Sequence, residues 1–160
     1  MTHRVNRATV AAMHRLKRLF TGLIALVLTA SATAAAELSG PAQAVDGGTL
    51  EIAGTIVRLY GIEAPKPGQR CPRPDGDYDC GQESGWALAD RIGRHWVRCA
   101  SRGQDADGRI IAACTIGADI DVNAHMVASG WAHARRDEAP DYVPLEDSAR
   151  LARRGIWQGR

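Results

Sequence analysis

Three short runs of alternating polar and apolar residues, separated by tight turns, occupy residues 40–62. The segment reads GPAQAVDGGTLEIAGTIVRLYGI. Gly47-Gly48 separates the first two runs, and Ala53-Gly54 indicates a hairpin turn between the second and the third. Strands this short need neighbours that cover their edges, so the segment predicts the start of a β-rich domain.

The rest of the chain predicts two more strands and three helices. HWVRCAS and RIIAACTIG are typical of an antiparallel pair, and GQESGWALADRIG of a helix that ends at Gly93. DVNAHMVASGW predicts a second helix with Asp121 as its N-cap, and a third helix begins at Pro144 and ends before Gly155. The order βββ-α-ββ-α-α favours a mainly β, α+β domain, namely a five-stranded barrel of the OB type with three helices. An open α+β sheet is the alternative.

Two patterns predict which side chains enter the core. Strand alternation in TIVRLYGI puts Val57 and Leu59 on one face. The opposite face then carries Ile56, Arg58, Tyr60 and Ile62. We expect the tryptophans to act mainly as core anchors rather than as base-stacking platforms. These tryptophans are Trp86, Trp96, Trp131 and Trp157.

Residues 1–36 have the three-part pattern of a secretory signal peptide. A basic segment leads into the apolar run LFTGLIALVLTA and then into small residues. The run is shorter than the roughly 20 residues that span a bilayer, which argues against the alternative of a membrane anchor. We therefore predict a periplasmic or secreted protein, with cleavage after Ala34 or Ala36 and Met13 as an alternative start. Residues 37–160 would then form a single domain.

Removal of this leader would reverse the sign of the net charge. The chain holds 20 Lys and Arg against 18 Asp and Glu. Five of the basic residues and none of the acidic ones lie in residues 1–36, which leaves 15 against 18, a formal charge of −3. A mildly acidic domain lacks the broad basic face of a tight polyanion binder, so nucleic-acid binding would have to come from a local cluster.

The four cysteines, Cys71, Cys80, Cys99 and Cys114, all lie after the predicted leader. An even number in an exported chain predicts two disulfides, for which three connectivities are possible. The simplest is local pairing, Cys71–Cys80 around a turn-rich loop and Cys99–Cys114 between two strands. Such bridges contribute about 2–4 kcal/mol each. A zinc site is the alternative, and it is disfavoured because the sequence has no CxxC spacing.

Five motifs in one order resemble the staphylococcal nuclease-like (thermonuclease) family. They are VDGGTL, VRLYGIEAPK, DADGR, VNAHMVASGWA and ARRGIW, and they extend from about Gly40 to Trp157. The family folds as an OB barrel with three helices, in agreement with the elements predicted above. Its active members are Ca²⁺-dependent phosphodiesterases that hydrolyse DNA and RNA. The resemblance therefore implies nucleic acid as the expected partner.

The chemistry of this family needs a metal, arginines and carboxylates together. Calcium takes several hard oxygen ligands, and on a phosphate oxygen it offsets the charge that builds on phosphorus. Arginines bind the phosphoryl group through their planar forks, and a carboxylate acts as base for the attacking water.

The family pattern carries over only in part. The two phosphate-binding arginines match Arg58 and Arg109. The first metal-binding aspartate falls on Gly48, which has no side chain, and the second falls on Glu63. The general-base glutamate falls on Lys66, whose ammonium group is no base for water.

These replacements change the charge expected in the pocket. Three carboxylates and two arginines give an active member −1 before calcium binds. Here Glu63 is set against Arg58, Lys66 and Arg109, a net charge of +2. A positive pocket repels a divalent cation and attracts anions. In addition, Asp107 stands where the family has an aromatic residue that frames the nucleotide.

Three hypotheses follow. The first is a catalytically impaired member in which Arg58, Lys66 and Arg109 bind nucleic acid or another acidic polymer without a cofactor. The second is an active nuclease in which Arg58, Arg109 and Glu63 are catalytic, and Asp46 and Glu63 bind Ca²⁺ or another divalent metal. The third is a structural envelope protein that uses the barrel as a scaffold. In each case we expect a monomer with no membrane anchor after signal cleavage.

Overall fold

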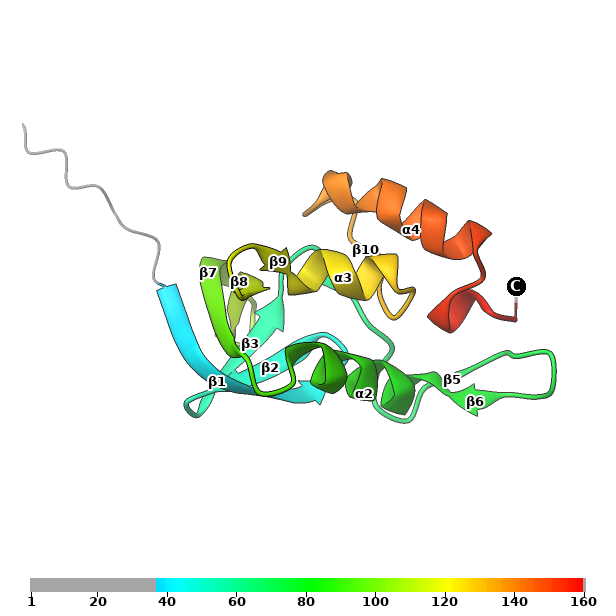
Figure 1. Cartoon of the computed structure of the whole chain (residues 1–160), viewed down its shortest axis with the longest axis horizontal. Helices are drawn as coiled ribbons and strands as arrows, with labels where there is room; N and C mark the ends of the chain where they lie inside the picture. The colour runs from blue at the N-terminus through cyan, green and yellow to red at the C-terminus, as the bar shows by residue number, and fades with distance from the viewer. Residues whose placement is uncertain (1–36, 160) are drawn as a thin grey trace, which may run out of the picture. The chain divides into compact units, whose positions relative to one another are not determined.

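Five strands close into a barrel in the computed structural model, which describes residues 37–159 (Figure 1). These strands are β1 Glu37–Asp46, β2 Thr49–Ile52, β3 Thr55–Leu59, β7 Trp96–Gln104 and β8 Ile110–Ile116. Antiparallel pairing gives the order β3-β2-β1-β7-β8, and a parallel pairing of β3 with β8 closes the barrel. The predicted OB-type barrel is confirmed, and the open sheet is wrong. The predicted signal peptide lies outside the described residues.

The strand β1 reaches two neighbours because it is long and irregular. Residues 37–41 pair with β7 and residues 42–46 pair with β2. The register shifts between Ala44 and Asp46. Such a bulge increases the local twist, which allows one strand to pass from one side of a small barrel to the other.

Three α-helices lie within the described residues, as predicted. They are α2 Cys80–Ile92, α3 Val122–Ala128 and α4 Val143–Leu151. Asp121 is the N-cap of α3, because its side chain accepts a hydrogen bond from the Ala124 amide. Asp79 caps α2 in the same way through the amide of Gln82. No helix in this part of the chain is both long and apolar enough to cross a membrane.

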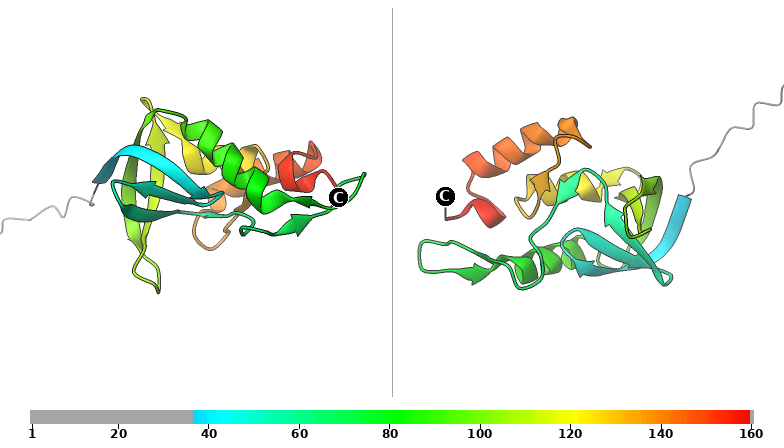
Figure 2. Two further views of the ribbon diagram at one scale, coloured as in Figure 1. Left: turned by 90° about the horizontal axis from the view of Figure 1, so that it is seen from below. Right: turned by 180° about the vertical axis from the view of Figure 1, so that it is seen from behind.

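Short elements connect the barrel to the helices. The two-residue strands are β4 Ile62–Glu63, β5 Arg70–Cys71, β6 Tyr78–Asp79, β9 Ile120–Asp121 and β10 His133–Ala134. Two 3₁₀ turns, η1 Pro140–Tyr142 and η2 Gly155–Trp157, flank α4. Both views in Figure 2 show the β5–β6 hairpin projecting beyond α2 at the end of the domain where the chain finishes.

The core has two parts, and each contains one disulfide. The barrel core includes Leu50, Val57 and Leu88 together with the Cys99–Cys114 bridge. A second cluster surrounds Trp157 and contains the Cys71–Cys80 bridge. The local connectivity predicted from the sequence is the one present.

Two predictions about burial are wrong in part. Ile62 is buried in the barrel core, because Gly61 has a φ of +73° and breaks the strand alternation just before it. Trp86 and Trp96 are each 60% exposed, so they are not core anchors, whereas Trp157 is 2% exposed. Trp86 lies on the outer side of α2, and Trp96 alternates with the buried Val97 on β7.

Candidate anion-binding site

The two predicted phosphate-binding arginines lie at the seam that closes the barrel. Strands β3 and β8 run parallel there, and Arg58 is level with Ile111. Arg109 lies in the loop immediately before β8, two residues before Ile111. The fold therefore places both arginines at or next to the pairing of β3 with β8.

Arg58 is paired with a carboxylate that the sequence analysis did not identify. Its Nη2 donates to Oε1 of Glu138 at 2.8 Å, and the two side chains are only 18% and 20% exposed. The amide of Gly61 donates to Oε2 of Glu138 at 2.9 Å. Nε of Arg135 lies 3.2 Å from Oε1. Three donors thus hold one carboxylate group.

Arg109 is neutralised within its own loop. Its Nε donates to Oδ2 of Asp105 at 2.7 Å, and its Nη2 lies 3.2 Å from Oδ2 of Asp107. Burial alone would raise the pKa of Asp105, but hydrogen bonds from the backbone and side chain of Arg109 lower it. Asp107, at the position of the family's aromatic residue, is therefore a counter-ion for the arginine.

Glu63 and Lys66 both lie exposed on the segment after β3. Glu63 pairs with His133 in the short β4–β10 ladder. The backbone amide of Lys66 donates to Oε1 of Gln69 at 3.0 Å. In residues 37–159 no group of three His, Cys, Asp or Glu is arranged to bind a metal ion.

Position 48, to which the family resemblance assigns a metal-binding aspartate, lies beside Ala64 and Asp46. Oδ1 of Asp46 accepts from the amide of Gly48 at 2.7 Å, which makes Asp46 a turn residue. A Cβ on Gly48 would lie 3.4 Å from Cβ of Ala64, the residue after Glu63, and 3.8 Å from Oδ1 of Asp46. A Cβ therefore has room at residue 48, where this sequence has a glycine.

These contacts revise the charge expected for the pocket. The net charge of +2 did not include Glu138, Asp105 or Asp107. Glu138 opposes Arg58, and the two aspartates oppose Arg109. Only the two aspartates could have been expected from the sequence to pair with Arg109, because they precede it closely in DADGR. Glu138 belongs to an irregular segment that no motif or period connects with Arg58.

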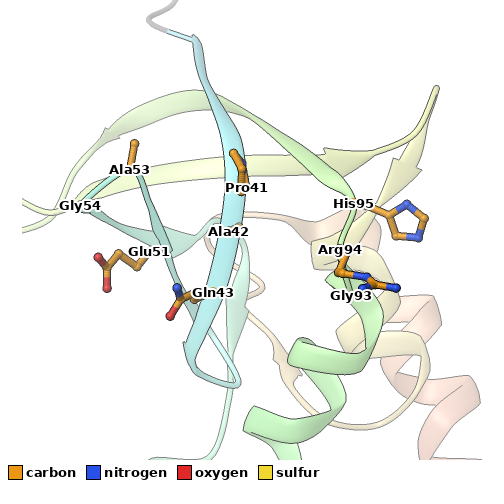
Figure 3. Close-up of a pocket in the computed structure, with 9 residues that line it drawn as sticks. All are labelled: Pro41, Ala42, Gln43, Glu51, Ala53, Gly54, Gly93, Arg94 and His95. Atoms are coloured by element: carbon orange, nitrogen blue, oxygen red, sulfur yellow. The ribbon is translucent and has the colours of Figure 1, made fainter.

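One groove on the domain does not involve these residues. It has a volume of about 510 Å³ and runs across β1. Figure 3 shows Arg94 and His95 on one side of this strand and Glu51 on the other, with the three side chains pointing outward. The polar groups of this groove do not converge on one point, so it offers no pre-formed site for a small ligand.

A closed OB barrel with two arginines at or next to its seam is the architecture of a nuclease-like domain. The profile of the family described as Staphylococcal nuclease homologue matches residues 56–159, and the chain belongs to this family.

Two known proteins are similar to this chain. The "Succinoglycan biosynthesis protein ExoI" of Rhizobium meliloti (strain 1021) is 37% identical over 141 residues, which cover 86% of this chain and 74% of that protein. The "Probable staphylococcal-like nuclease CAN4" of Oryza sativa subsp. japonica is 31% identical over 103 residues, which cover 63% of this chain and 19% of the rice protein. The match to the rice protein therefore concerns one part of a longer chain.

Proposed function

We propose that this protein is an exported family member that binds phosphate groups of single-stranded nucleic acid and does not cleave them by the calcium-dependent reaction. One observation carries the proposal: carboxylates pair with both arginines, whereas the first metal position and the general-base position have none. Glu138 forms an ion pair with Arg58, while Gly48 and Lys66 occupy positions where active members have carboxylates.

The physical reason is that binding and cleavage need different groups. A guanidinium group can bind a phosphate by itself through charge and paired hydrogen bonds. Cleavage also needs a cation to offset charge on phosphorus and a base to activate water. The replacement of two carboxylates by Gly48 and Lys66 weakens cation binding and the activation of water. Phosphate binding by the arginines does not depend on those two carboxylates.

Export is part of the proposal. Two disulfides in a domain of this size are typical of proteins that fold in an oxidising compartment. This supports the signal peptide predicted for residues 1–36. We therefore propose the periplasm or the medium as the place of action.

An active nuclease is the second candidate function. The position of residue 48 supports it, because a Cβ there would lie 3.4 Å from Cβ of Ala64, the residue after Glu63. A cation bound between Asp46 and Glu63 would then replace the usual set. The name of the Rhizobium relative refers to succinoglycan biosynthesis, so an acidic polysaccharide is the alternative polymer ligand.

The test measures cleavage and binding in one set of samples. The oxidised protein is incubated with single-stranded DNA and Ca²⁺, Mg²⁺, Mn²⁺ or EDTA. We expect no metal-dependent cleavage, and salt-dependent binding that is lost in Arg58→Ala. Arg94→Ala, at an exposed site on the groove across β1, is the matched control and should bind like the wild type. Metal-dependent cleavage that Arg58→Ala abolishes would establish the nuclease instead.

A further inference from the structure

The carboxylate of Glu138 lies in a cradle made by three donors from two segments of the chain, residues 58–61 and residue 135. These donors are Nη2 of Arg58 at 2.8 Å, the amide of Gly61 at 2.9 Å and Nε of Arg135 at 3.2 Å. We propose that this cradle is the phosphate subsite of the protein, and that Glu138 is a built-in occupant which the ligand must displace. The inference rests on the proposed function and adds Arg135, Gly61 and Glu138 to it.

The donor set fits an oxyanion with two free oxygens. One oxygen of Glu138 receives the two guanidinium groups, and the other receives a backbone amide. A phosphodiester also presents two non-bridging oxygens and one negative charge. Each of its two oxygens can therefore take the place of one carboxylate oxygen. Arginine forks and backbone N–H groups are the donors that proteins use for phosphate.

Glu138 can leave the cradle by side-chain rotation alone, because other contacts hold its backbone. The Tyr60 hydroxyl donates to the carbonyl of Glu138. The amide of Arg135 donates to the carbonyl of Gly61 at 2.9 Å. The φ of Gly61 is +73°, and a Cβ there would lie 2.4 Å from Cβ of Ala139, so this segment packs directly on the barrel. None of these contacts uses the carboxylate.

An internal occupant lowers the apparent affinity for an external one. The observed dissociation constant equals the intrinsic constant divided by the fraction of molecules in which the cradle is open. The glutamate is covalently attached and always close, so the closed form dominates at low ligand concentration. Removal of its charge should therefore tighten ligand binding, although the wild-type residue makes good contacts.

Two neighbouring acidic residues provide a matched pair for the test. Glu138→Gln removes the charge inside the cradle. Asp137→Asn removes the same charge one residue away, from a side chain that is 72% exposed and contacts Arg135 at 3.4 Å. The full chain, exported and oxidised, is titrated with fluorescein-labelled octathymidylate at fixed salt, and binding is followed by fluorescence anisotropy.

We expect Glu138→Gln to bind octathymidylate about tenfold more tightly than the wild type, since one charged hydrogen-bonded group no longer competes. Asp137→Asn should change the affinity less than about twofold, as expected for an exposed charge. Addition of Arg58→Ala to Glu138→Gln should remove the gain. Equal gains in the two single variants would mean that only net charge matters and would overturn the inference.

A second matched pair keeps the inference testable if Glu138→Gln does not fold. Arg135→Ala should weaken binding about tenfold, because it removes one donor of the cradle. Arg136→Ala should leave affinity unchanged, because Arg136 pairs with Glu146 and not with Glu138. Equal affinities of Arg135→Ala and the wild type would overturn the assignment of the cradle as the phosphate subsite.

The outcomes also separate this inference from the function on which it rests. Wild-type binding that needs Arg58 but does not respond to Glu138→Gln would leave the proposed function standing and overturn the built-in occupant. A gain with trigalacturonate and none with octathymidylate would overturn nucleic-acid phosphate as the ligand of the cradle. Tighter binding of Glu138→Gln to octathymidylate alone supports both the proposed function and the built-in occupant.

Discussion

Asn123 of α3 donates a hydrogen bond from its side-chain amide to the carbonyl of Tyr60 at 2.8 Å. The same amide donates to the carbonyl of Ala112 at 3.1 Å, and its oxygen accepts from the amide of Cys114 at 3.0 Å. Asn123 is fully buried. One side chain therefore attaches α3 both to β8 and to the end of β3 that carries Arg58.

Asn123→Ala should destabilise the domain by about 2–4 kcal/mol, because it leaves several buried backbone groups without partners. Urea unfolding followed by tryptophan fluorescence measures the change. Gln43→Ala, at an exposed position of β1, is the control and should change the free energy of unfolding by less than about 0.5 kcal/mol. Similar stabilities of the two variants would contradict the role assigned to Asn123.

Each disulfide should contribute separately to stability, because the two lie in different parts of the core. Replacement of Cys99 and Cys114 by alanine should lower the free energy of unfolding by about 2–4 kcal/mol, and replacement of Cys71 and Cys80 by a similar amount. Denaturant unfolding with and without a reductant measures both. Reductant should still destabilise each double variant, because one bridge remains in it. A double variant that does not respond to reductant would contradict this pairing.

His125 should make the domain less stable in weak acid. Burial, with added repulsion from Arg91, lowers the pKa of His125 below its ordinary value. The unfolded state then binds more protons than the folded state as the pH falls below about 6.5, so stability falls with pH in that range.

The measurement for His125 is the melting temperature between pH 7.5 and pH 5. His125→Gln should flatten this dependence, whereas the exposed His95→Gln should leave it unchanged. Parallel curves for the wild type and His125→Gln would show that other groups cause the pH effect.

A calcium site should return when the two missing carboxylates are restored. A Cβ at residue 48 meets no atom closer than 3.4 Å, so Gly48→Asp introduces its Cβ in ordinary van der Waals contact. Together with Lys66→Glu it should create calcium binding that raises the melting temperature, with a stabilisation of about 2.7 kcal/mol when calcium is a hundredfold above the dissociation constant.

The matched control for the calcium prediction is Gly48→Asn with Lys66→Gln, which has the same size without the charge. Neither this control nor the wild type should respond to calcium. A melting temperature of the acidic variant that calcium leaves unmoved would mean that residues 48 and 66 do not face the same site.

Local features of this chain could be predicted from the sequence because the residues that encode them are neighbours along it. The strand and helix order, the Asp121 cap and the short disulfide loops all depend on contacts across a few positions. The prediction for Ile62 was wrong at a single point, since a positive φ at Gly61 interrupts the alternation.

The charge of the site depended on distant residues and could not be predicted in this way. Arg58 and Glu138 are 80 positions apart, and Glu138 lies in an irregular segment whose docking on the barrel no periodic pattern describes. By itself the sequence determined the elements, the disulfides and the arginines at the seam. Only the tertiary structure decided that Glu138 opposes Arg58, because an ion pair between remote segments forms only after the core has placed both segments.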